Sequence, residues 1–189
     1  MPNLLFISGS TRADSFHLKL LHVLGKQVAS IAEINHLNLN DFNLPIYNGD
    51  LESESGLPQA ATDLKAKMSA ADGLVIGCPE YNGFMSPLLI NVIDWCTRSD
   101  AGGVDLSAFS DKSVFIASAS PGPGGGARSA THLKTMLSGL GAIVLPQTLS
   151  LPTAFSAFDA DGNLTDEGMA KRSEKLMTKF IQMTNKLNA

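Results

Sequence analysis

The chain has 189 residues, of which 44% are hydrophobic and 17% charged, a composition typical of a globular protein that can bury one substantial core. Its net charge of −4 offers no basic surface for nucleic acid or an anionic membrane, so we expect neither as a partner. No apolar run approaches the roughly 20 residues of a membrane span, and no basic region precedes the first apolar run, so we expect one cytoplasmic domain over residues 1–189.

Apolar runs of strand length alternate with longer segments of helical periodicity. Most of the apolar runs are continuous, which favours parallel strands that are covered on both faces. The second alternates apolar and polar residues and predicts a strand exposed on one face. In chain order, the expected elements are strand Leu4–Ser8, helix Phe16–Ile31, strand Glu33–Leu39, helix Leu57–Ala70, strand Gly73–Gly77, helix Pro87–Cys96, strand Ser113–Ser118, helix Ala127–Gly139, strand Ala142–Leu145 and helix Thr165–Leu187.

These elements predict an α/β fold, a doubly wound five-stranded parallel sheet with helices on both faces. Two stretches, Phe42–Leu57 and Leu149–Gly162, are expected to be irregular. In such sheets ligands bind beyond the carboxyl ends of the strands, at the point where the strand order reverses. The loops that follow the first, third and fourth strands therefore carry the candidate site.

The first of these loops reads GSTRADS. Its Gly9 permits close backbone approach, and Ser10 and Ser15 offer hydroxyls. Amides at the start of the helix and the Arg12 guanidinium complete an inventory that suits a phosphomonoester. Neither GxxxxGK[ST] nor GxGxxG is present, which argues against a triphosphate or pyrophosphate. The alternative interpretation is a helix cap and a glycine turn that bind nothing.

The second loop begins at Pro79, which ends the third strand, and contains Asn82-Gly83, which predicts a turn. Tyr81 and the neighbouring amides suit the face and polar edge of a flat ring. The alternative is that Tyr81 and Phe84 are packing residues. Cys78, at the strand end, is expected to be a small buried residue.

The third loop, from Ala119 to Arg128, is rich in glycine, which lets the backbone approach a ligand closely; a flexible loop without a ligand is the alternative. Gly122-x-Gly124-x-x-Ala127 also fits the string GxGxxA. No Asp or Glu lies within the next 20 residues, so the acid that binds ribose in a dinucleotide site is missing. We therefore do not expect a dinucleotide fingerprint here.

Three motifs together resemble the NADPH-dependent FMN reductase family of flavodoxin-like quinone, azo and chromate reductases. They are GSTRADSF, PEYNGFMSP with the following NVIDW, and GGARSATHLKTML, in an order and spacing that extend over nearly the whole chain. The resemblance implies the strand order 2-1-3-4-5 and a tightly held FMN, with its phosphate in the first loop and its ring against the other two.

Carried over residue by residue, the resemblance implies a set of cofactor-binding positions from all three loops. They are Ser10, Arg12, Ser15, Phe16, His17, Pro79, Glu80, Tyr81, Asn82, Gly83, Ser118, Ser120, Gly122 and Gly125. His17 stands where many members have asparagine. The segment Ser86–Asn91 lacks the family's glycine and lysine, which alters the rim near the acceptor or a subunit interface.

The resulting hypothesis is an oxidoreductase in which NAD(P)H, as NADPH or NADH, reduces FMN, and FMN reduces a small acceptor such as a quinone, flavin, azo compound or metal oxyanion. The flavin carries this chemistry, so no side chain is expected to be catalytic. Two alternatives are a non-enzymatic FMN electron carrier or redox sensor of flavodoxin type, and a flavin-free binding module. The mild acidity of the chain favours an enzyme over a carrier.

The cysteines, the remaining histidines and the Asp159 segment do not indicate a further binding site. Two cysteines with no zinc or CxxC spacing indicate neither a disulfide scaffold nor a metal site, and His22, His36 and His132 are too dispersed for one. Asp159-x-Asp161-Gly162 resembles a calcium loop with the wrong spacing and is expected to be an exposed turn.

The family resemblance implies a homodimer or homotetramer. Residues 42–47 and 88–95 are the candidate contacts between subunits, and Trp95 is expected either in that interface or in the core of its own subunit.

Overall fold

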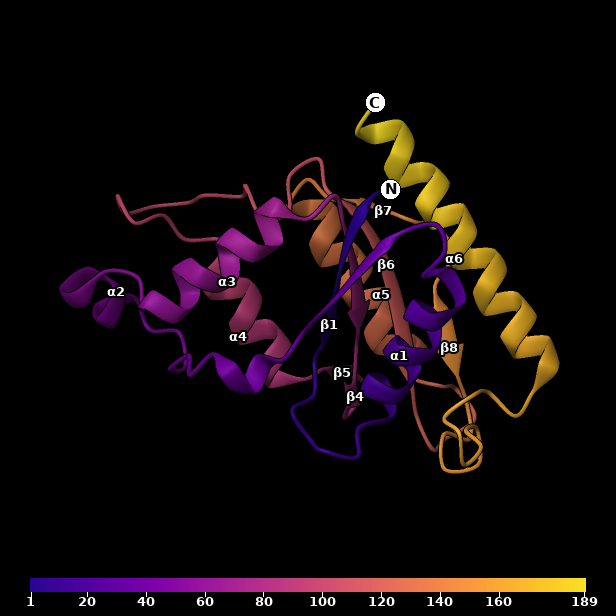
Figure 1. The fold of residues 1–189 in the computed structure, drawn as a ribbon. Coiled ribbons are helices and arrows are strands. Elements are labelled where there is room, and N and C mark those ends of the chain that lie inside the picture. Colours follow the sequence, from indigo (N-terminus) through magenta and orange to yellow (C-terminus); the bar gives the residue numbers. More distant parts are fainter.

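A parallel sheet runs through the centre of the computed structural model, which describes residues 1–189 (Figure 1). Its strands lie in the order β2-β1-β3-β6-β7, and β8 also pairs with β6. The strands are β1 (Asn3–Ser8), β2 (Glu33–Leu37), β3 (Gly73–Gly77), β6 (Ser113–Ala119), β7 (Ile143–Val144) and β8 (Leu149–Leu151). This is the predicted order 2-1-3-4-5, so the expectation of a flavodoxin-like doubly wound sheet is confirmed.

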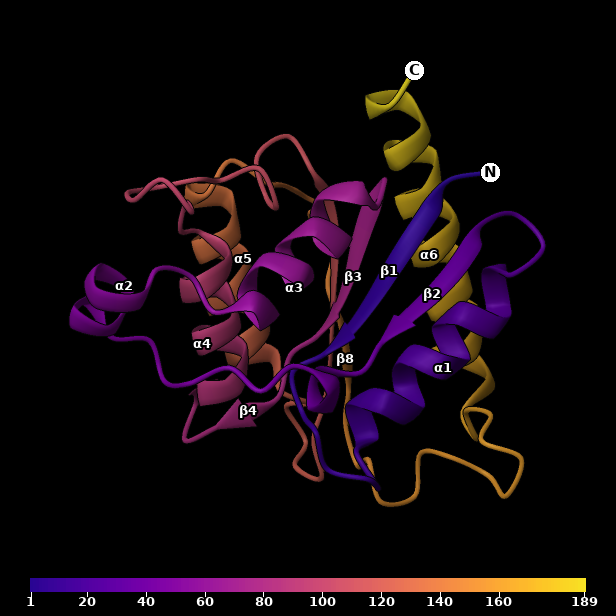
Figure 2. The same cartoon turned by 60° about the vertical axis from the view of Figure 1, so that its left-hand side comes forward.

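Helices cover both faces of this sheet (Figure 2). On one face α1 (Phe16–Val28) and α6 (Glu167–Leu187) pack on Leu4 and Phe6 of β1. On the other face α3 (Gln59–Ala70), α4 (Pro87–Cys96) and α5 (Ala127–Gly139) pack on Leu5 and Ile7. Because successive strand residues point to opposite faces, one uninterrupted apolar run serves both cores.

The fifth strand differs from the expectation. It is divided into β7 and β8, which pair with the two ends of β6, and the stretch predicted to be irregular from Leu149 begins with β8. Pro146 lies between the two pieces and has no backbone N–H to donate. Pairing therefore stops at Leu145, whose amide donates to Val114 O at 2.9 Å, and resumes three residues after the proline.

The segment 42–57, also predicted to be irregular, contains α2 (Gly49–Ser55), which buries no residue. It follows the short helix η1 (Leu39–Asp41). The chain before α2 is fastened to α4 through Pro45, whose carbonyl accepts hydrogen bonds from Asn91 Nδ2 at 2.9 Å and Trp95 Nε1 at 2.8 Å. Trp95 is fully buried, so it belongs to the core of its own chain.

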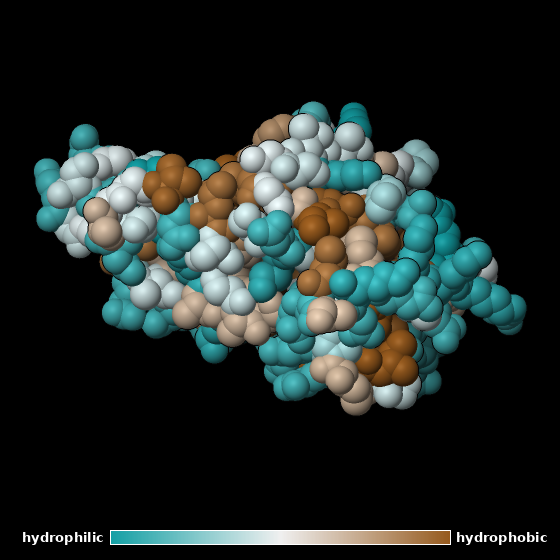
Figure 3. All heavy atoms as spheres, turned by 90° about the horizontal axis from the view of Figure 1, so that it is seen from above, coloured by the Kyte–Doolittle hydropathy of each residue, from teal (hydrophilic) through white to brown (hydrophobic).

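Both chain termini lie at the amino ends of the strands, where hydrophobic residues form separate patches among hydrophilic ones (Figure 3). At the opposite end, the loops after β1, β3 and β6 meet. The second of these loops forms the hairpin of β4 (Glu80–Tyr81) and β5 (Phe84–Met85). No helix of the chain combines the length and the hydropathy that a bilayer crossing requires.

The turn expected near Asp159 is confirmed. Asp159 Oδ1 accepts hydrogen bonds from the amides of Asp161 at 2.9 Å and Asn163 at 2.8 Å, which closes a local loop on the carboxylate. Side-chain acceptance of this kind is what Asp commonly does in turns.

Candidate functional site

The three loops enclose a cavity of about 270 Å³ at the carboxyl edge of the sheet, which we call the loop cavity. Its wall combines hydroxyls, one guanidinium and aromatic rings, and it contains most of the residues predicted from the sequence. The lining residues are Ser10, Arg12, Ser15, Phe16, His17, Pro79, Glu80, Tyr81, Ala119, Ser120, Pro121 and Phe155.

Gly9 brings the first loop directly against the second. A Cβ at this position would lie 2.7 Å from Pro79 Cδ, so only glycine fits without displacing the proline. The Gly9 amide donates to Gly77 O at 2.8 Å, and Ser86 Oγ donates to Gly9 O at 2.7 Å. Both polar groups of Gly9 are thus satisfied while the two loops share one wall of the cavity.

The first loop ends in a helix N-terminus that has free donors. Ser15 caps α1 by accepting a hydrogen bond from the Leu18 amide at 3.4 Å, whereas the amides of Phe16 and His17 bond to no group of the protein. Arg12 makes no ion pair, and its guanidinium carbon lies 5.1 Å from the centre of the Phe16 ring. Free amides, a helix N-terminus and an unpaired cation together form a site for an anion such as a phosphomonoester.

His17 uses its ring within the protein. It is buried, and its Nε2 accepts a hydrogen bond from the Ala119 amide at 3.1 Å. Burial lowers the pKa of His17 to about 4, despite a hydrogen bond with the Cys78 backbone that acts in the opposite direction. The side chain is therefore neutral at pH 7, and it joins α1 to the third loop through the nitrogen that faces Ala119.

The hairpin in the second loop turns at Asn82 and Gly83, with φ of 54° and 82°, which confirms the predicted turn. These two residues lie outside the wall of the loop cavity. Tyr81 lines the cavity with half of its side chain open to solvent. Tyr81 therefore contributes a partly exposed aromatic ring to the cavity wall.

Glu80 connects the second loop to the third. Its Oε1 accepts from Arg128 Nε at 2.8 Å, and its Oε2 accepts from the amides of Arg128 at 3.1 Å and Ser129 at 3.4 Å. Partial burial raises the pKa of Glu80, but the hydrogen bonds from Arg128 and Ser129 outweigh it and leave the pKa below its usual range. The carboxylate thus caps α5 while it lines the cavity.

The third loop contributes Ser120 to the loop cavity and continues into an adjoining hollow of about 350 Å³ that contains Gly122 and Gly125. Gly125 has φ of 59°, and a Cβ there would lie 2.8 Å from the Leu151 carbonyl carbon. Ser118 lies beneath this loop, fully buried, and its hydroxyl donates to Ser150 Oγ at 3.1 Å. The Ser118 side chain is therefore part of the sheet and not of the cavity wall.

Sequence reasoning missed Phe155, Ala119 and Pro121. Phe155 follows β8 and has 80% of its side chain exposed, and its ring meets Phe16 edge-on at 5.2 Å between centres. It was missed because its strand was not predicted, so nothing placed residue 155 beside the first helix. The signal that could have found it is the apolar pattern of Leu149 and Leu151.

Comparisons with known proteins agree with this arrangement. Residues 2–156 match the model of the NADPH-dependent FMN reductases. The chain is 32% identical to an NADPH:quinone oxidoreductase of Arabidopsis thaliana, over 96% of this chain and 91% of that protein. It is 30% identical to a quinone reductase of Escherichia coli K12, over 91% and 89%.

A solved structure, that of a flavoenzyme NAD(P)H:(acceptor) oxidoreductase from Paracoccus denitrificans, superposes with a TM-score of 0.81. The identity is 29%, and the match covers 98% of each chain. The similarity extends over the sheet, both helical layers and the three loops.

Proposed function

The chain belongs to the NADPH-dependent FMN reductase family, and we propose that its loop cavity holds FMN and presents it to NAD(P)H and to a quinone. As a member of this family it is an oxidoreductase that depends on FMN and NAD(P)H. The observation that carries the assignment of the site is one cavity whose wall contains both an unpaired guanidinium, that of Arg12, and the half-exposed ring of Tyr81.

The residues present fit the phosphate of FMN. Arg12, Ser10, Phe16 and His17 all line the cavity on the side of the first loop, and the amides of Phe16 and His17 are free to donate. No carboxylate of this loop competes for Arg12, because Asp14 pairs with Lys19. A dianionic phosphate would thus meet donors and a cation without a nearby uncompensated negative charge.

The ring of FMN would lie between the second and third loops. Pro79 and Tyr81 form one side, and Ser120 with the glycine turn at Gly122 forms the other. Glu80 and Arg128 fix the separation of these loops, because the ion pair and the α5 cap involve both. We assign positioning roles to Glu80, His17 and Ser118, and expect Asn82 and Gly83 to shape the hairpin at the rim.

The FMN that the loop cavity would hold would supply the redox chemistry, taking hydride from NAD(P)H and giving two electrons to the acceptor, while the three loops would bind and orient it. The chain's own contribution is an open mouth at Tyr81 through which donor and acceptor can enter in turn. The acid and the base in the wall of the loop cavity are both engaged within the protein: Glu80 accepts from Arg128 and Ser129, and the neutral His17 accepts from Ala119 at Nε2. We therefore assign no catalytic side chain.

We propose a quinone as the acceptor because several relatives are named for quinone reduction and because aromatic rings border the cavity. Phe16 and Phe155 form an apolar wall against which a flat, weakly polar ring can pack. A small oxyanion would gain nothing from this wall. A quinone should therefore be reduced with a lower KM than chromate.

We also propose that residues 1–189 act as one FMN-binding domain and assemble into a homodimer or homotetramer. Within the stretch 42–47, Ile46 is 86% exposed beside the Pro45 carbonyl that binds α4, so it is a candidate interface residue. Both cysteines are free and buried, which suits a cytoplasmic location. Mass measured over a range of protein concentrations would contradict the assembly if it gave only monomer.

The second candidate, a non-enzymatic FMN carrier, is favoured only by the shared fold. The experiment that separates the two is steady-state oxidation of NADPH by the FMN-loaded protein with benzoquinone as acceptor. An enzyme gives many turnovers per flavin with saturation in both substrates. Oxidation that does not exceed the rate with free FMN alone would favour a carrier and contradict the proposal.

A further inference from the structure

The turn of the hairpin in the second loop, Asn82-Gly83, has a chemistry that the proposed function does not use. When glycine follows Asn or Asp, its amide nitrogen can attack the side-chain carbonyl carbon of the preceding residue, because no Cβ shields the nitrogen. The chain contains four such pairs: Asn48-Gly49, Asp72-Gly73, Asn82-Gly83 and Asp161-Gly162. The structure distinguishes among them by which reacting groups are already engaged.

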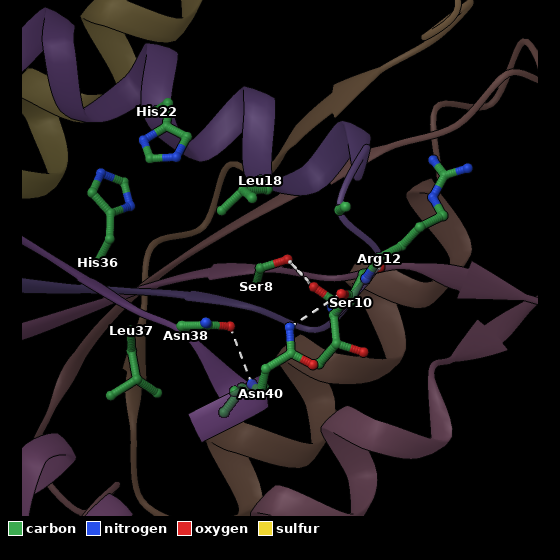
Figure 4. Close-up of a pocket in the computed structure, with 12 residues that line it drawn as sticks. Ser8, Ser10, Arg12, Leu18, His22, His36, Leu37, Asn38 and Asn40 are labelled. Carbon is green, nitrogen blue, oxygen red and sulfur yellow. Dashed lines mark hydrogen bonds between the residues drawn. The ribbon is translucent and has the colours of Figure 1, made fainter. Parts of the chain in front are cut away.

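In the pair Asn82-Gly83 both reacting groups are free. Asn82 is exposed at the tip of the hairpin, its carboxamide bonds to no group of the protein, and the Gly83 amide has no acceptor. The asparagines beside the first loop are different, as Figure 4 shows: Asn38 Oδ1 accepts from the Asn40 amide at 3.1 Å, and Asn40 Nδ2 donates to Thr11 O at 3.2 Å. The Asn82 side chain is therefore free to turn toward the Gly83 nitrogen.

Each of the other three pairs has at least one reacting group engaged. Asn48 Oδ1 accepts from the Asp50 amide at 2.8 Å, which caps α2. The Gly162 amide donates to Asp159 O at 3.1 Å. Asp72 leads into the buried strand β3, and its carboxylate accepts a backbone amide of β1 at 2.7 Å. Reaction at any of these pairs requires a hydrogen bond to break first.

The surroundings of Asn82-Gly83 favour the attack. The hairpin has only the residue pairs of Glu80 with Met85 and of Tyr81 with Phe84, and such a short ribbon is marginal by itself, so its tip can open. A Cβ on Gly83 would lie 3.8 Å from Arg128 Cζ, which places the guanidinium beside the turn. A cation there stabilises the negative charge that develops on the attacked oxygen.

We propose that Asn82 is a modification site, at which the Gly83 nitrogen attacks Asn82 Cγ and closes a succinimide ring. The new bond from nitrogen to Cγ replaces the bond from Cγ to the side-chain nitrogen, which leaves as ammonia with the proton of the Gly83 amide. Water then adds to either carbonyl of the ring, and residue 82 becomes aspartate or isoaspartate. Water is the only co-reactant.

The product carries a carboxylate beside Arg128, where it competes with Glu80 for the guanidinium. Because the pair of Glu80 and Arg128 joins the second and third loops, this competition loosens the wall of the loop cavity. This consequence rests on the proposed function, in which the two loops hold FMN. Asn82→Asp should therefore raise the Kd for FMN roughly threefold. Asn48→Asp, which keeps a good helix cap, is the matched control and should leave the Kd unchanged.

The direct test is peptide mapping by mass spectrometry after the purified protein is kept in mildly alkaline buffer. Conversion raises the mass of a peptide by about one dalton, because NH is replaced by O. In the native protein we expect residue 82 to convert at least about fivefold faster than residue 48, since the latter must first break one hydrogen bond. In denaturant both Asn-Gly pairs are free and should convert at similar rates.

Equal native rates at the two asparagines, or a preference for residue 82 that persists in denaturant, would overturn the assignment of the site. An unchanged Kd for FMN in Asn82→Asp would overturn the effect on the loop cavity. The mapping needs neither FMN nor NADPH, so its result is separate from that of the proposed function. A protein that converts at residue 82 but never binds FMN would contradict the proposed function and leave the modification site established.

Discussion

Nε2 of His17 accepts a hydrogen bond from the Ala119 amide at 3.1 Å, which joins the first turn of α1 to the end of β6. The bond requires an unprotonated nitrogen, so it holds only while the imidazole is neutral. Because burial keeps the pKa of His17 near 4, that condition is met at pH 7. The geometry of the loop cavity is therefore linked to pH through this residue.

Replacing His17 by asparagine should change how stability depends on pH. The folded protein protonates His17 near pH 4 and the unfolded chain near pH 6.5, so the unfolded state binds more protons between these values. The contribution of His17 is then present above pH 6.5 and is lost as pH falls toward 4. Relative to His17→Asn, the wild type should lose roughly 2–3 kcal/mol of unfolding free energy between pH 7.5 and 4.5.

Urea denaturation at the two pH values measures this difference directly. Parallel stability profiles of the two proteins would show that His17 is not buried as a neutral ring. The partial burial of His36 affects both proteins alike and cancels in the comparison.

Replacing Arg12 by alanine should weaken FMN binding. A hydrogen bond to a charged group contributes about 1.5–3 kcal/mol, so the Kd for FMN should rise roughly 10- to 100-fold in a fluorescence titration. Lys26→Ala, which removes an exposed cation in the last turn of α1 outside the loop cavity, is the control and should change the Kd less than about twofold. Equal effects of the two substitutions on the Kd would contradict the assignment of Arg12 to the phosphate of FMN.

The stability of the protein should depend on Gly125 of the third loop and much less on its neighbour Gly124. Gly125→Ala places a Cβ 2.8 Å from the Leu151 backbone at a φ of 59°, so we expect a loss of about 2 kcal/mol or more in unfolding free energy. Gly124→Ala meets open space and should cost less than about 1 kcal/mol. Chemical denaturation that ranked the two in the reverse order would contradict the described loop.

Neither cysteine should react in the native protein. Burial raises the pKa of both Cys78 and Cys96 to about 12, which leaves almost no thiolate at pH 8. Alkylation with iodoacetamide should therefore proceed only at the rate of unfolding, with two thiols appearing in denaturant. Rapid modification of Cys78 in the folded state would contradict its burial and would show a reactive thiol at the edge of the cavity.

Much of the fold could be predicted because a continuous apolar run such as Gly73–Gly77 is too short for a core helix and too apolar for a surface loop. The fifth strand was predicted at Ala142–Leu145, where β7 lies, but its continuation β8 was not, because Pro146 interrupts the strand and three residues are too few to recognise by periodicity. The residue types of the loop cavity followed from local sequence, as Ser10 and Arg12 show. The roles of Glu80 and His17 did not, since each depends on a partner distant in the sequence: Arg128 for one and Ala119 for the other.

If the loop cavity holds FMN that NADPH reduces and a quinone reoxidises, both steps are visible in the flavin itself. The decisive observation is the visible spectrum of the FMN-loaded protein during anaerobic addition of NADPH and then benzoquinone. We expect the flavin band to bleach on the first addition and to recover on the second. A bound flavin that NADPH leaves unchanged would contradict the reductase, and failure to retain FMN at all would contradict the site.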